Sequence, residues 1–276
     1  MLLRGFPFYF SIICCMVLLS CNEYQKVLKN EDIKPKYELA QSFYDSGDFK
    51  RANRLLEQIA SKYIGKPQGE RVMFFLANSY YELEDFNTAG YQFERFIKSY
   101  PQSDKTTEAS FLGAKSYYKL SPNYSLDQTD TDKALLKLQN FINSYSESTY
   151  FKEANSMAQE LTTKKERKAY EIVKQYNKLG EFNYDMLKSA VAASDNFVAD
   201  FPGSIYREDA LFLKVDALTY MALNSFERIQ EERLTSAKTA YNAFIKQYPE
   251  TKFEKETKAL LKRIENGLEN FTAELK

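Results

Sequence analysis

An eight-residue phrase that closes one helix and opens the next recurs along this chain, and it constrains the fold more than any other feature. The clear copies read FIKSYPQS at 96–103, FINSYSES at 141–148, FVADFPGS at 197–204 and FIKQYPET at 244–251, and a weaker copy, IASKYIGK, stands at 59–66. The leading aromatic and the apolar residue after it are expected core contacts. Pro should end the helix because it has no N–H to donate, and the final Ser or Thr can cap the next helix. A helix stop repeated at intervals of 37 to 56 residues predicts a helical repeat array.

Between the phrases, small and aromatic residues recur at fixed offsets. Ala40, Ala77 and Ala114 are separated by steps of 37 residues, and residues 40–56 read Ala-x2-Phe followed by Gly-Asp-Phe-x2-Ala-x3-Leu. This spacing resembles the tetratricopeptide repeat, in which two antiparallel helices approach closely through small residues while aromatics fill the seam. We therefore expect an all-α fold, a tetratricopeptide-repeat superhelical solenoid of about five helix pairs plus a C-terminal capping helix, with a concave surface. The alternative is an irregular helical bundle.

Two irregularities divide the expected array. The loop at 120–132 in the third pair carries about eight extra residues and should be exposed. The third copy of the phrase has Ser146 where the other clear copies have Pro, and a helix without a breaker is expected after it, over 151–179. We predict an N-terminal half at 35–149, with repeats 1 to 3, and a C-terminal half at 150–276, with repeats 4 and 5 and the cap.

The N-terminus has the pattern of an export signal. Residues 1–20 carry one positive charge followed by an apolar run, which is shorter than the roughly 20 apolar residues that a spanning helix needs. Residues 18–21, Leu-Leu-Ser-Cys, resemble the lipobox of bacterial lipoproteins, whose cysteine is lipidated after the signal is cut. The resemblance implies a lipoprotein signal peptide at 1–20, lipidation of Cys21, and a short polar tether without periodicity at 21–34. An ordinary signal peptide with an incidental cysteine is the alternative.

Composition argues against most catalytic chemistry. The chain has no His, which excludes Ser-His-Asp and Cys-His catalysis and His-ligated zinc. Lys plus Arg and Asp plus Glu number 38 each, so no net field attracts nucleic acid. No Gly-rich phosphate loop or Cys pair occurs. We expect no enzyme activity, no metal and no cofactor besides the covalent lipid. The basic run 164–168 could contact anionic head groups or a partner, or be only a solvated helix face.

The concave face is the expected binding surface. In tetratricopeptide repeats it is lined by the first helix of each pair and usually binds peptides, and the family's offsets select two aromatics from each of the first three repeats, beside polar groups. The groove residues predicted in this way are Tyr37, Tyr44, Phe74, Asn78, Tyr81, Phe111, Lys115 and Tyr118. Such a groove could bury the side chains of an aromatic-ending peptide while Asn78, Lys115 and Lys119 hold its backbone or carboxylate. The alternative is that the aromatics pack between adjacent first helices.

Together, these features resemble the BamD-type lipoproteins of the outer-membrane β-barrel assembly machinery, in the form seen in Bacteroidetes-like bacteria. The carrying features are the lipobox cysteine, the tether, five repeats, the junction phrase, the long central helix and the segment KLSPNYSLDQ at 119–128. The resemblance implies a scaffold whose C-terminal repeats dock on the periplasmic domains of the barrel-forming assembly protein. Its N-terminal repeats would receive the C-terminal signals of unfolded outer-membrane proteins. The implied location is the periplasmic face of the outer membrane, held by the lipid anchor.

Two other functions fit parts of the pattern. A tetratricopeptide lipoprotein could instead coordinate cell-wall synthesis or envelope constriction, and the partners recovered with it would separate the two. A surface glycan-binding lipoprotein is disfavoured, because such proteins are larger and rich in Trp at the sugar platform, and this chain has no Trp.

Overall fold

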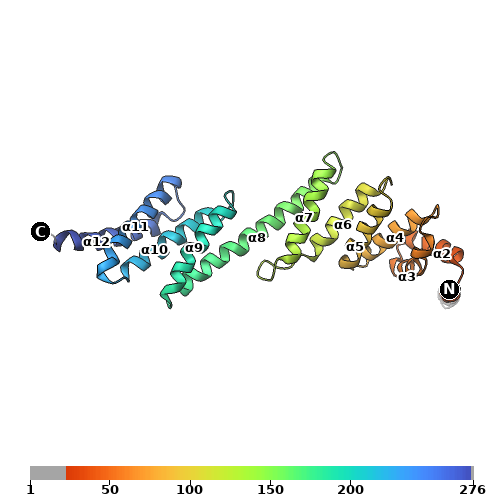
Figure 1. Cartoon of the computed structure of the whole chain (residues 1–276), viewed down its shortest axis with the longest axis horizontal. Coiled ribbons are helices and arrows are strands. Elements are labelled where there is room, and N and C mark those ends of the chain that lie inside the picture. The colour runs from red at the N-terminus through yellow and green to blue at the C-terminus, as the bar shows by residue number, and fades with distance from the viewer. Residues whose placement is uncertain (1–22, 275–276) are drawn as a thin grey trace, which may run out of the picture. The chain divides into compact units, whose positions relative to one another are not determined.

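The structure, a computed structural model, describes residues 23–274, with side chains to residue 271. The described chain is all-α: residues 23–29 are helical, and no strand occurs between residues 23 and 274 (Figure 1). The helices that follow are α2 (Ile33–Asp45), α3 (Phe49–Ile59), the 3-10 helix η1 (Ala60–Tyr63), α4 (Gly69–Glu82), α5 (Phe86–Ser99), α6 (Thr106–Leu120), α7 (Thr129–Ser144), α8 (Phe151–Leu179), α9 (Tyr184–Asp200), α10 (Arg207–Leu223), α11 (Glu227–Gln247) and α12 (Glu254–Glu274).

Consecutive helices pack as pairs of the tetratricopeptide type. Helix α2 packs on α3, α4 on α5, α6 on α7, and α10 on α11. Helices α8 and α9 share a core in which Val173 meets Phe197. The last helix, α12, packs on both α10 and α11 and buries Leu260 and Ile264. The predicted all-α fold of five helix pairs with a C-terminal capping helix is thereby confirmed.

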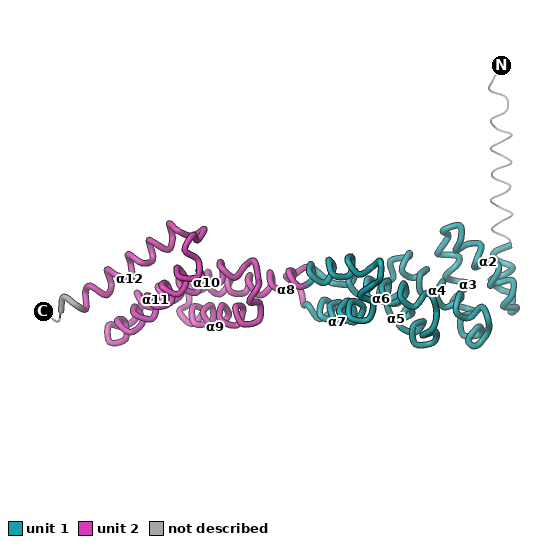
Figure 2. Tube along the Cα trace, turned by 90° about the horizontal axis from the view of Figure 1, so that it is seen from above, with its two compact units in different colours: residues 1–122, 128–161 teal, residues 123–127, 162–276 magenta. Residues whose placement is uncertain are grey.

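The chain forms two compact units, which Figure 2 colours separately. Unit 1 comprises the residues up to Pro122 together with Gln128–Leu161, and unit 2 comprises Asn123–Asp127 together with the residues from Thr162 onward. The long helix α8 supplies residues to both. The functional halves that we divide between residues 149 and 150 stay a prediction, because a division by packing says nothing about partners.

The recurring phrase behaves at both ends as its residues predict. Its leading aromatics, Phe96, Phe141, Phe197 and Phe244, are at most 2% exposed and fill the seams of successive pairs. In all four clear copies the final Ser or Thr oxygen accepts a hydrogen bond from the backbone N–H two residues later, at 3.0–3.2 Å. This local bond turns the chain into the next helix.

Proline, however, is not what ends each helix. The helix stops before the second aromatic of the phrase, and Tyr100, Tyr145, Phe201 and Tyr248 share φ between −135° and −128° and ψ between 53° and 72°. Tyr145 adopts this conformation although Ser146 follows it. What the copies share is the packing of the second aromatic ring on the leading one, at 5.3–5.7 Å between centroids. Pro reinforces the break, because the residue before Pro is disfavoured in helical conformation.

The turns inside the pairs are closed by short polar side chains. Asp48, Asp85 and Asn183 cap α3, α5 and α9 by accepting backbone N–H bonds of 3.0–3.2 Å. In the first two turns the residue before the cap is in the left-handed region, with φ 78° at Gly47 and 61° at Glu84. The two positions lie 37 residues apart, so the turn geometry repeats with the sequence.

The start of the described chain differs from what we expected. Residues 23–29 form a helix, whereas we predicted a tether without periodicity. Tyr24, Val27 and Leu28 are spaced as one helical face, and Tyr24 is buried edge-on against Phe43 at 5.6 Å. The predicted signal peptide and Cys21 lie outside the described residues. Of the helices within residues 23–274, none is both long and apolar enough to cross a bilayer.

Candidate functional site

The last three repeat junctions are closed by a pair of stacked rings. In each of them an aromatic residue stands two positions after the Ser or Thr that ends the phrase. Its ring lies flat on an aromatic ring of the first helix of the preceding pair. The pairs are Tyr150 on Phe111 at 4.5 Å and 8°, Tyr206 on Tyr170 at 5.0 Å and 5°, and Phe253 on Phe212 at 4.1 Å and 7°. Each stack fills the space between one pair of helices and the next.

A hydroxyl-to-carboxylate bond forms at three of the junctions, two of which also carry a ring stack. The hydroxyl of the Ser or Thr that ends the phrase donates to a Glu carboxylate on the first helix of the preceding pair. This Glu lies near the start of α4 and α10 and in the middle of α8. The bonds run from Ser103 to Glu70, from Ser204 to Glu166 and from Thr251 to Glu208, at 2.5–2.9 Å. In all three cases the Glu stands four residues before the aromatic of that helix, so both contacts come from one helix face.

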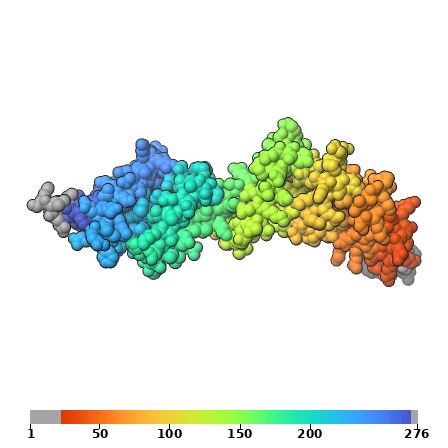
Figure 3. All heavy atoms as spheres, viewed as in Figure 1, coloured from red at the N-terminus to blue at the C-terminus, as the bar shows by residue number. Residues whose placement is uncertain are grey.

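The first two junctions lack the aromatic, and a cleft lies there. The equivalent positions hold Gln68 and, 37 residues later, Lys105, whose ammonium nitrogen is 5.3 Å from the ring centre of Phe74. The cleft has a volume of about 500 Å³. Its walls are Tyr37, Pro67, Gln68, Glu70, Arg71, Phe74, Phe75, Asp104 and Lys105. They come from α2, from α4 and from the turns before α4 and α6, in the part of the chain coloured red to yellow in Figures 1 and 3. An unfilled aromatic position in two adjoining junctions accounts for this opening.

The cleft combines aromatic walls with charges of both signs. Glu70 is engaged by Ser103, and Lys105 forms an ion pair of 2.8 Å with Glu108. Arg71 is exposed, and within the described residues it has no ion pair. A ligand that enters the cleft therefore meets aromatic surface and an available guanidinium, which is suited to a carboxylate.

The predicted polar groove residues link neighbouring first helices. The Asn78 amide donates to the Tyr44 hydroxyl at 2.7 Å, and Tyr44 stacks on Phe75 at 3.8 Å. Further along, the Lys115 ammonium lies close to the Tyr81 hydroxyl and forms an ion pair of 2.8 Å with Glu153. In the same way the Tyr118 hydroxyl donates to Glu160 at 2.7 Å. The side chains thus form polar rungs from α2 through α4 and α6 to α8.

Burial and these bonds control the charge states of the rungs. Burial raises the pKa of Tyr44 to about 12 against the opposing effect of the Asn78 bond. Burial, with the Glu160 carboxylate, raises the pKa of Tyr118 to about 12. Burial alone would lower the pKa of Lys115, but the hydrogen bond to Glu153 raises it. At neutral pH the rungs therefore present neutral phenols and one cationic lysine.

Two of the eight predicted groove residues lie in the core, which corrects the expectation that their rings line an open groove. Phe74 is 6% exposed and meets Phe93 and Phe96, and Phe111 is 2% exposed between Phe141 and Tyr150. Both rings turn toward the second helix of their own pair, which a helical offset alone does not reveal.

Phe74 keeps an edge on the cleft, as does Tyr37. The remaining six residues, Tyr37, Tyr44, Asn78, Tyr81, Lys115 and Tyr118, are partly exposed. A peptide-binding role for these residues stays a prediction, as does the lipidation of Cys21.

Sequence reasoning missed the residues that keep the cleft open. Gln68 and Lys105 stand in the junctions, which we treated as structural, whereas the family's offsets place Arg71 on the concave face. The available signal was the position two residues after the Ser or Thr, which is aromatic at 150, 206 and 253 but not at 68 or 105. Among residues 23–274, no group of three or more His, Cys, Asp or Glu side chains is placed to hold a metal ion.

Comparison with known proteins gives one family. The model of the family described as "YfiO: Outer membrane lipoprotein" matches residues 29–184 and 181–274 of the chain. None of the curated proteins compared with the chain matches it.

Two solved structures are similar at a low level, and both are described as Podosopora anserina putative kinesin light chain nearly identical TPR-like repeats, one of them carrying a point substitution. The substituted form is 13% identical over 87% of this chain and 96% of its own, with a TM-score of 0.32. The other is 14% identical over 86% and 97%, also with a TM-score of 0.32. Scores this low support no argument about this chain.

Proposed function

The chain belongs to the YfiO family of outer membrane lipoproteins, and from this premise we propose that it is a non-enzymatic scaffold of the β-barrel assembly machinery. In this proposal unit 1 receives the C-terminal signal of unfolded outer-membrane proteins. Residues after 150 dock on the periplasmic domains of the barrel-forming assembly protein. The lipid on Cys21 holds the chain to the periplasmic face of the outer membrane.

The observation that carries the proposal is the open cleft at the first two junctions. Later in the chain the same position is filled by the protein's own ring, stacked at 4.1–5.0 Å on a first-helix aromatic. A peptide that ends in an aromatic residue can supply that ring from outside and place it against Phe74 and Tyr37. Its terminal carboxylate then lies beside Arg71, which has no ion pair within the described residues. The cleft thus matches both ends of such a ligand.

Anchoring explains how such a scaffold works without catalysis. A lipid on Cys21 would confine peptide receptor and docking surface to the membrane where clients arrive. Confinement raises the effective concentration of the partners without any new contact. Two or more acyl chains make such attachment firm, whereas a single chain gives only marginal binding.

Filling the cleft tests the proposal. The variant Lys105→Tyr places at the second junction the ring that closes the last three, so it should stack on Phe74 and exclude the ligand. We expect binding of a labelled peptide ending in Phe with a free carboxylate, measured by fluorescence anisotropy, to weaken at least about tenfold, or ~1.4 kcal/mol. Thermal stability should be unchanged or higher, because the new ring adds an apolar contact.

Two controls define the result. Lys98→Tyr, an equivalent change at an exposed position of α5, should leave peptide affinity unchanged. Arg71→Gln should weaken binding of the peptide carboxylate but not of its C-terminal amide. Unchanged affinity in Lys105→Tyr would show that the cleft is not the receptor.

A further inference from the structure

Unit 2 exposes two phenylalanine rings at adjoining turns. Phe182 is 84% exposed and Phe226 is 86% exposed, the highest values among the large hydrophobic residues described. Phe182 stands in the inner turn between α8 and α9, and Phe226 in the inner turn between α10 and α11. Leu179, 42% exposed, precedes the first of these turns. We refer to Leu179, Phe182 and Phe226 as the phenylalanine edge.

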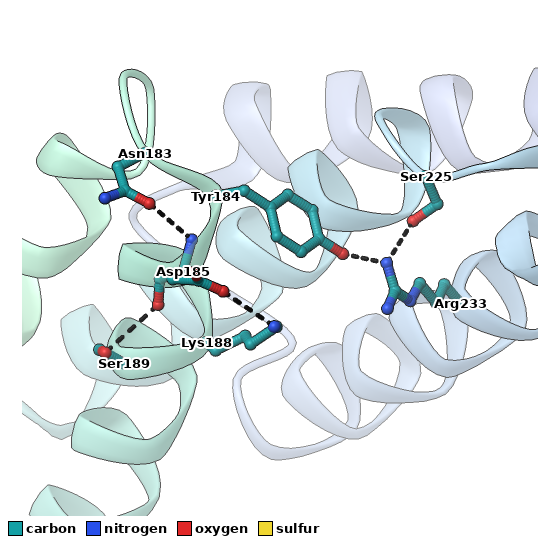
Figure 4. A network of polar contacts seen from close by, with 7 residues as sticks. All are labelled: Asn183, Tyr184, Asp185, Lys188, Ser189, Ser225 and Arg233. Carbon is teal, nitrogen blue, oxygen red and sulfur yellow. Dashed lines mark hydrogen bonds and ion pairs between the residues drawn. The ribbon is translucent and has the colours of Figure 1, made fainter.

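A polar network ties the two turns together (Figure 4). The Arg233 guanidinium donates from one nitrogen to both the Tyr184 hydroxyl and the Ser225 hydroxyl, the latter at 2.7 Å. The Ser225 hydroxyl donates in turn to the carbonyl of Met221 at 2.6 Å. Tyr184 is two residues from Phe182, and Ser225 adjoins Phe226. The turns that carry the exposed rings are therefore braced against each other rather than independent loops.

The turn between α8 and α9 is also held by bonds at the start of α9. The Asn183 side chain accepts the N–H of Asp185 at 3.0 Å, and Asp185 pairs with Lys188 at 2.9 Å. The bonds fix the backbone that follows Phe182, while its ring stays outside the core. An exposed ring on a braced turn is a feature that a solvated surface does not require.

The size of the edge indicates what covers it. Two aromatic side chains bury roughly 300–500 Å² together, at about 150–250 Å² each. A specific protein interface buries about 800 Å² on each partner, so this edge is too small to form a stable dimer or docking interface alone. Insertion of a few apolar side chains into a lipid interface has no such requirement, because it adds to an existing attachment.

The charges on the edge point to the same kind of surface. Lys178 and Arg228 are balanced by Glu181 and Glu227 on the same turns or the helix ends beside them. A balanced edge has no electrostatic preference for an anionic peptide or for strongly charged lipid, and its binding should depend on apolar burial. For a member of a family of outer membrane lipoproteins, the apolar surface at hand is the bilayer.

We propose that the phenylalanine edge of unit 2 is a membrane-contact surface, on which Phe182 and Phe226 enter the interfacial region of the outer membrane. The contact supplements the lipid anchor and keeps unit 2 at the bilayer surface. It rests on the family alone and not on peptide capture by unit 1.

The absence of Trp from the chain makes the test direct. Phe182→Trp and Phe226→Trp each introduce a single reporter into the full-length protein reconstituted in neutral phospholipid vesicles. We expect blue-shifted emission at both positions and strong quenching by brominated acyl chains. Neither signal should change as salt is raised, because the local charges balance.

Ile205→Trp is the matched control. Ile205 is 72% exposed in the turn between α9 and α10, and the 17 residues of α9, about 25 Å long, separate that turn from Phe182. Quenching at 182 and 226 should exceed that at 205 several-fold. Equal quenching at all three positions overturns the proposal. So does a blue shift without lipid quenching, or one that requires the barrel-forming assembly protein, because either result identifies a protein partner.

A paired substitution separates this inference from the proposed function. Phe182→Ser with Phe226→Ser should leave helical content and peptide affinity unchanged, since both rings lie outside the core and neither lines the cleft. The same variant should lose the lipid-dependent quenching at a Trp reporter placed at Leu179. Retained quenching there would show that the phenylalanines do not hold the edge at the membrane.

Discussion

Single side chains decide what the repeat junctions can do. Lys105 stands where the last three junctions carry a ring, and its ammonium lies 5.3 Å from the Phe74 ring centre instead of a stacked aromatic. Because Lys105 lines the cleft without being part of the core, a substitution there changes the shape of the cleft without disturbing the packing of the core. Truncating Phe74 would be a poorer probe, because removing a buried Phe costs about 3–5 kcal/mol and would confuse lost binding with lost folding. The cleft therefore exists because positions 68 and 105 lack the aromatic ring that the last three junctions carry at the equivalent position.

Cys21 is the residue on which membrane attachment depends in our proposal. The variant Cys21→Ala should be released from the membrane fraction or keep its signal uncut, because it has no thiol to accept the lipid. Fractionation together with the mass of the mature N-terminus measures both outcomes. Cys15→Ala, a change inside the expected signal, serves as the control and should leave attachment unchanged. Full membrane attachment and lipid labelling of Cys21→Ala would refute the lipobox interpretation.

At the scale of elements, the repeated phrase acts as a unit that spans a junction. Its leading aromatic fills the seam of one pair, and its second aromatic breaks the helix by packing back on the first. Its Ser or Thr then turns the chain and, in three of the four clear copies, also reaches a Glu of the preceding first helix. One local sequence therefore sets the end of a helix, the start of the next and the spacing between pairs.

The third copy offers a test of this division of roles. Tyr145 already has the backbone conformation of the residues that precede Pro in the other copies, with φ −135° and ψ 53°. Ser146→Pro should therefore fit and raise the free energy of unfolding by about 0.4–1 kcal/mol, by restricting the unfolded chain. Denaturant unfolding followed by circular dichroism measures the change. Ser148→Ala, which removes the turn bond, should instead lower it by ~1 kcal/mol. Destabilisation by Ser146→Pro would mean that this junction has a geometry of its own.

At the scale of the whole molecule, the two units differ in chemistry. Unit 1 carries the cleft and the polar rungs, and unit 2 carries the phenylalanine edge. Among the described residues, tyrosines with a raised pKa also concentrate in unit 1. They are Tyr24, Tyr44, Tyr63, Tyr80, Tyr81, Tyr100, Tyr117 and Tyr118 in unit 1 and Tyr170 in unit 2, and burial is the leading cause in each.

This asymmetry predicts how the molecule responds to alkali. A raised tyrosine pKa means that the folded chain holds the phenolic proton more tightly than the unfolded chain, whose tyrosines titrate near pH 10. The stability that these groups contribute is complete below pH 10 and is lost as the pH rises through the folded value, about 12 for Tyr44 and Tyr118. We expect unit 1 to unfold at lower pH than unit 2, so the helical circular dichroism signal should fall in two steps. A single step, or no loss up to about pH 12, would contradict the expectation.

The sequence by itself determined the helix pairs and the family. Helix ends depend on short-range contacts, such as the cap at Asp48 or the packing of Tyr100 on Phe96, and such contacts lie within a few residues of each other in the chain. These contacts recur at the 37-residue step, so the helix ends can be predicted from the sequence alone. The lipobox prediction rests on the same kind of local pattern, because export signals are recognised as linear sequence.

Only the tertiary structure decided which aromatics are available. A helical offset puts a residue on a face, but the rotation of the helix against two neighbours decides whether that face is core, as for Phe74 and Phe111, or partly open, as for Tyr37. The absence of a ring at 68 and 105 is visible in the sequence, but the cleft is a space between side chains that are distant in sequence, so only packing shows that the absence leaves an opening. Exposure of Phe182 and Phe226 likewise depends on what the rest of unit 2 leaves uncovered. The helices can be predicted from the sequence because local contacts determine them. The cleft and the phenylalanine edge cannot, because they form only when the helices pack.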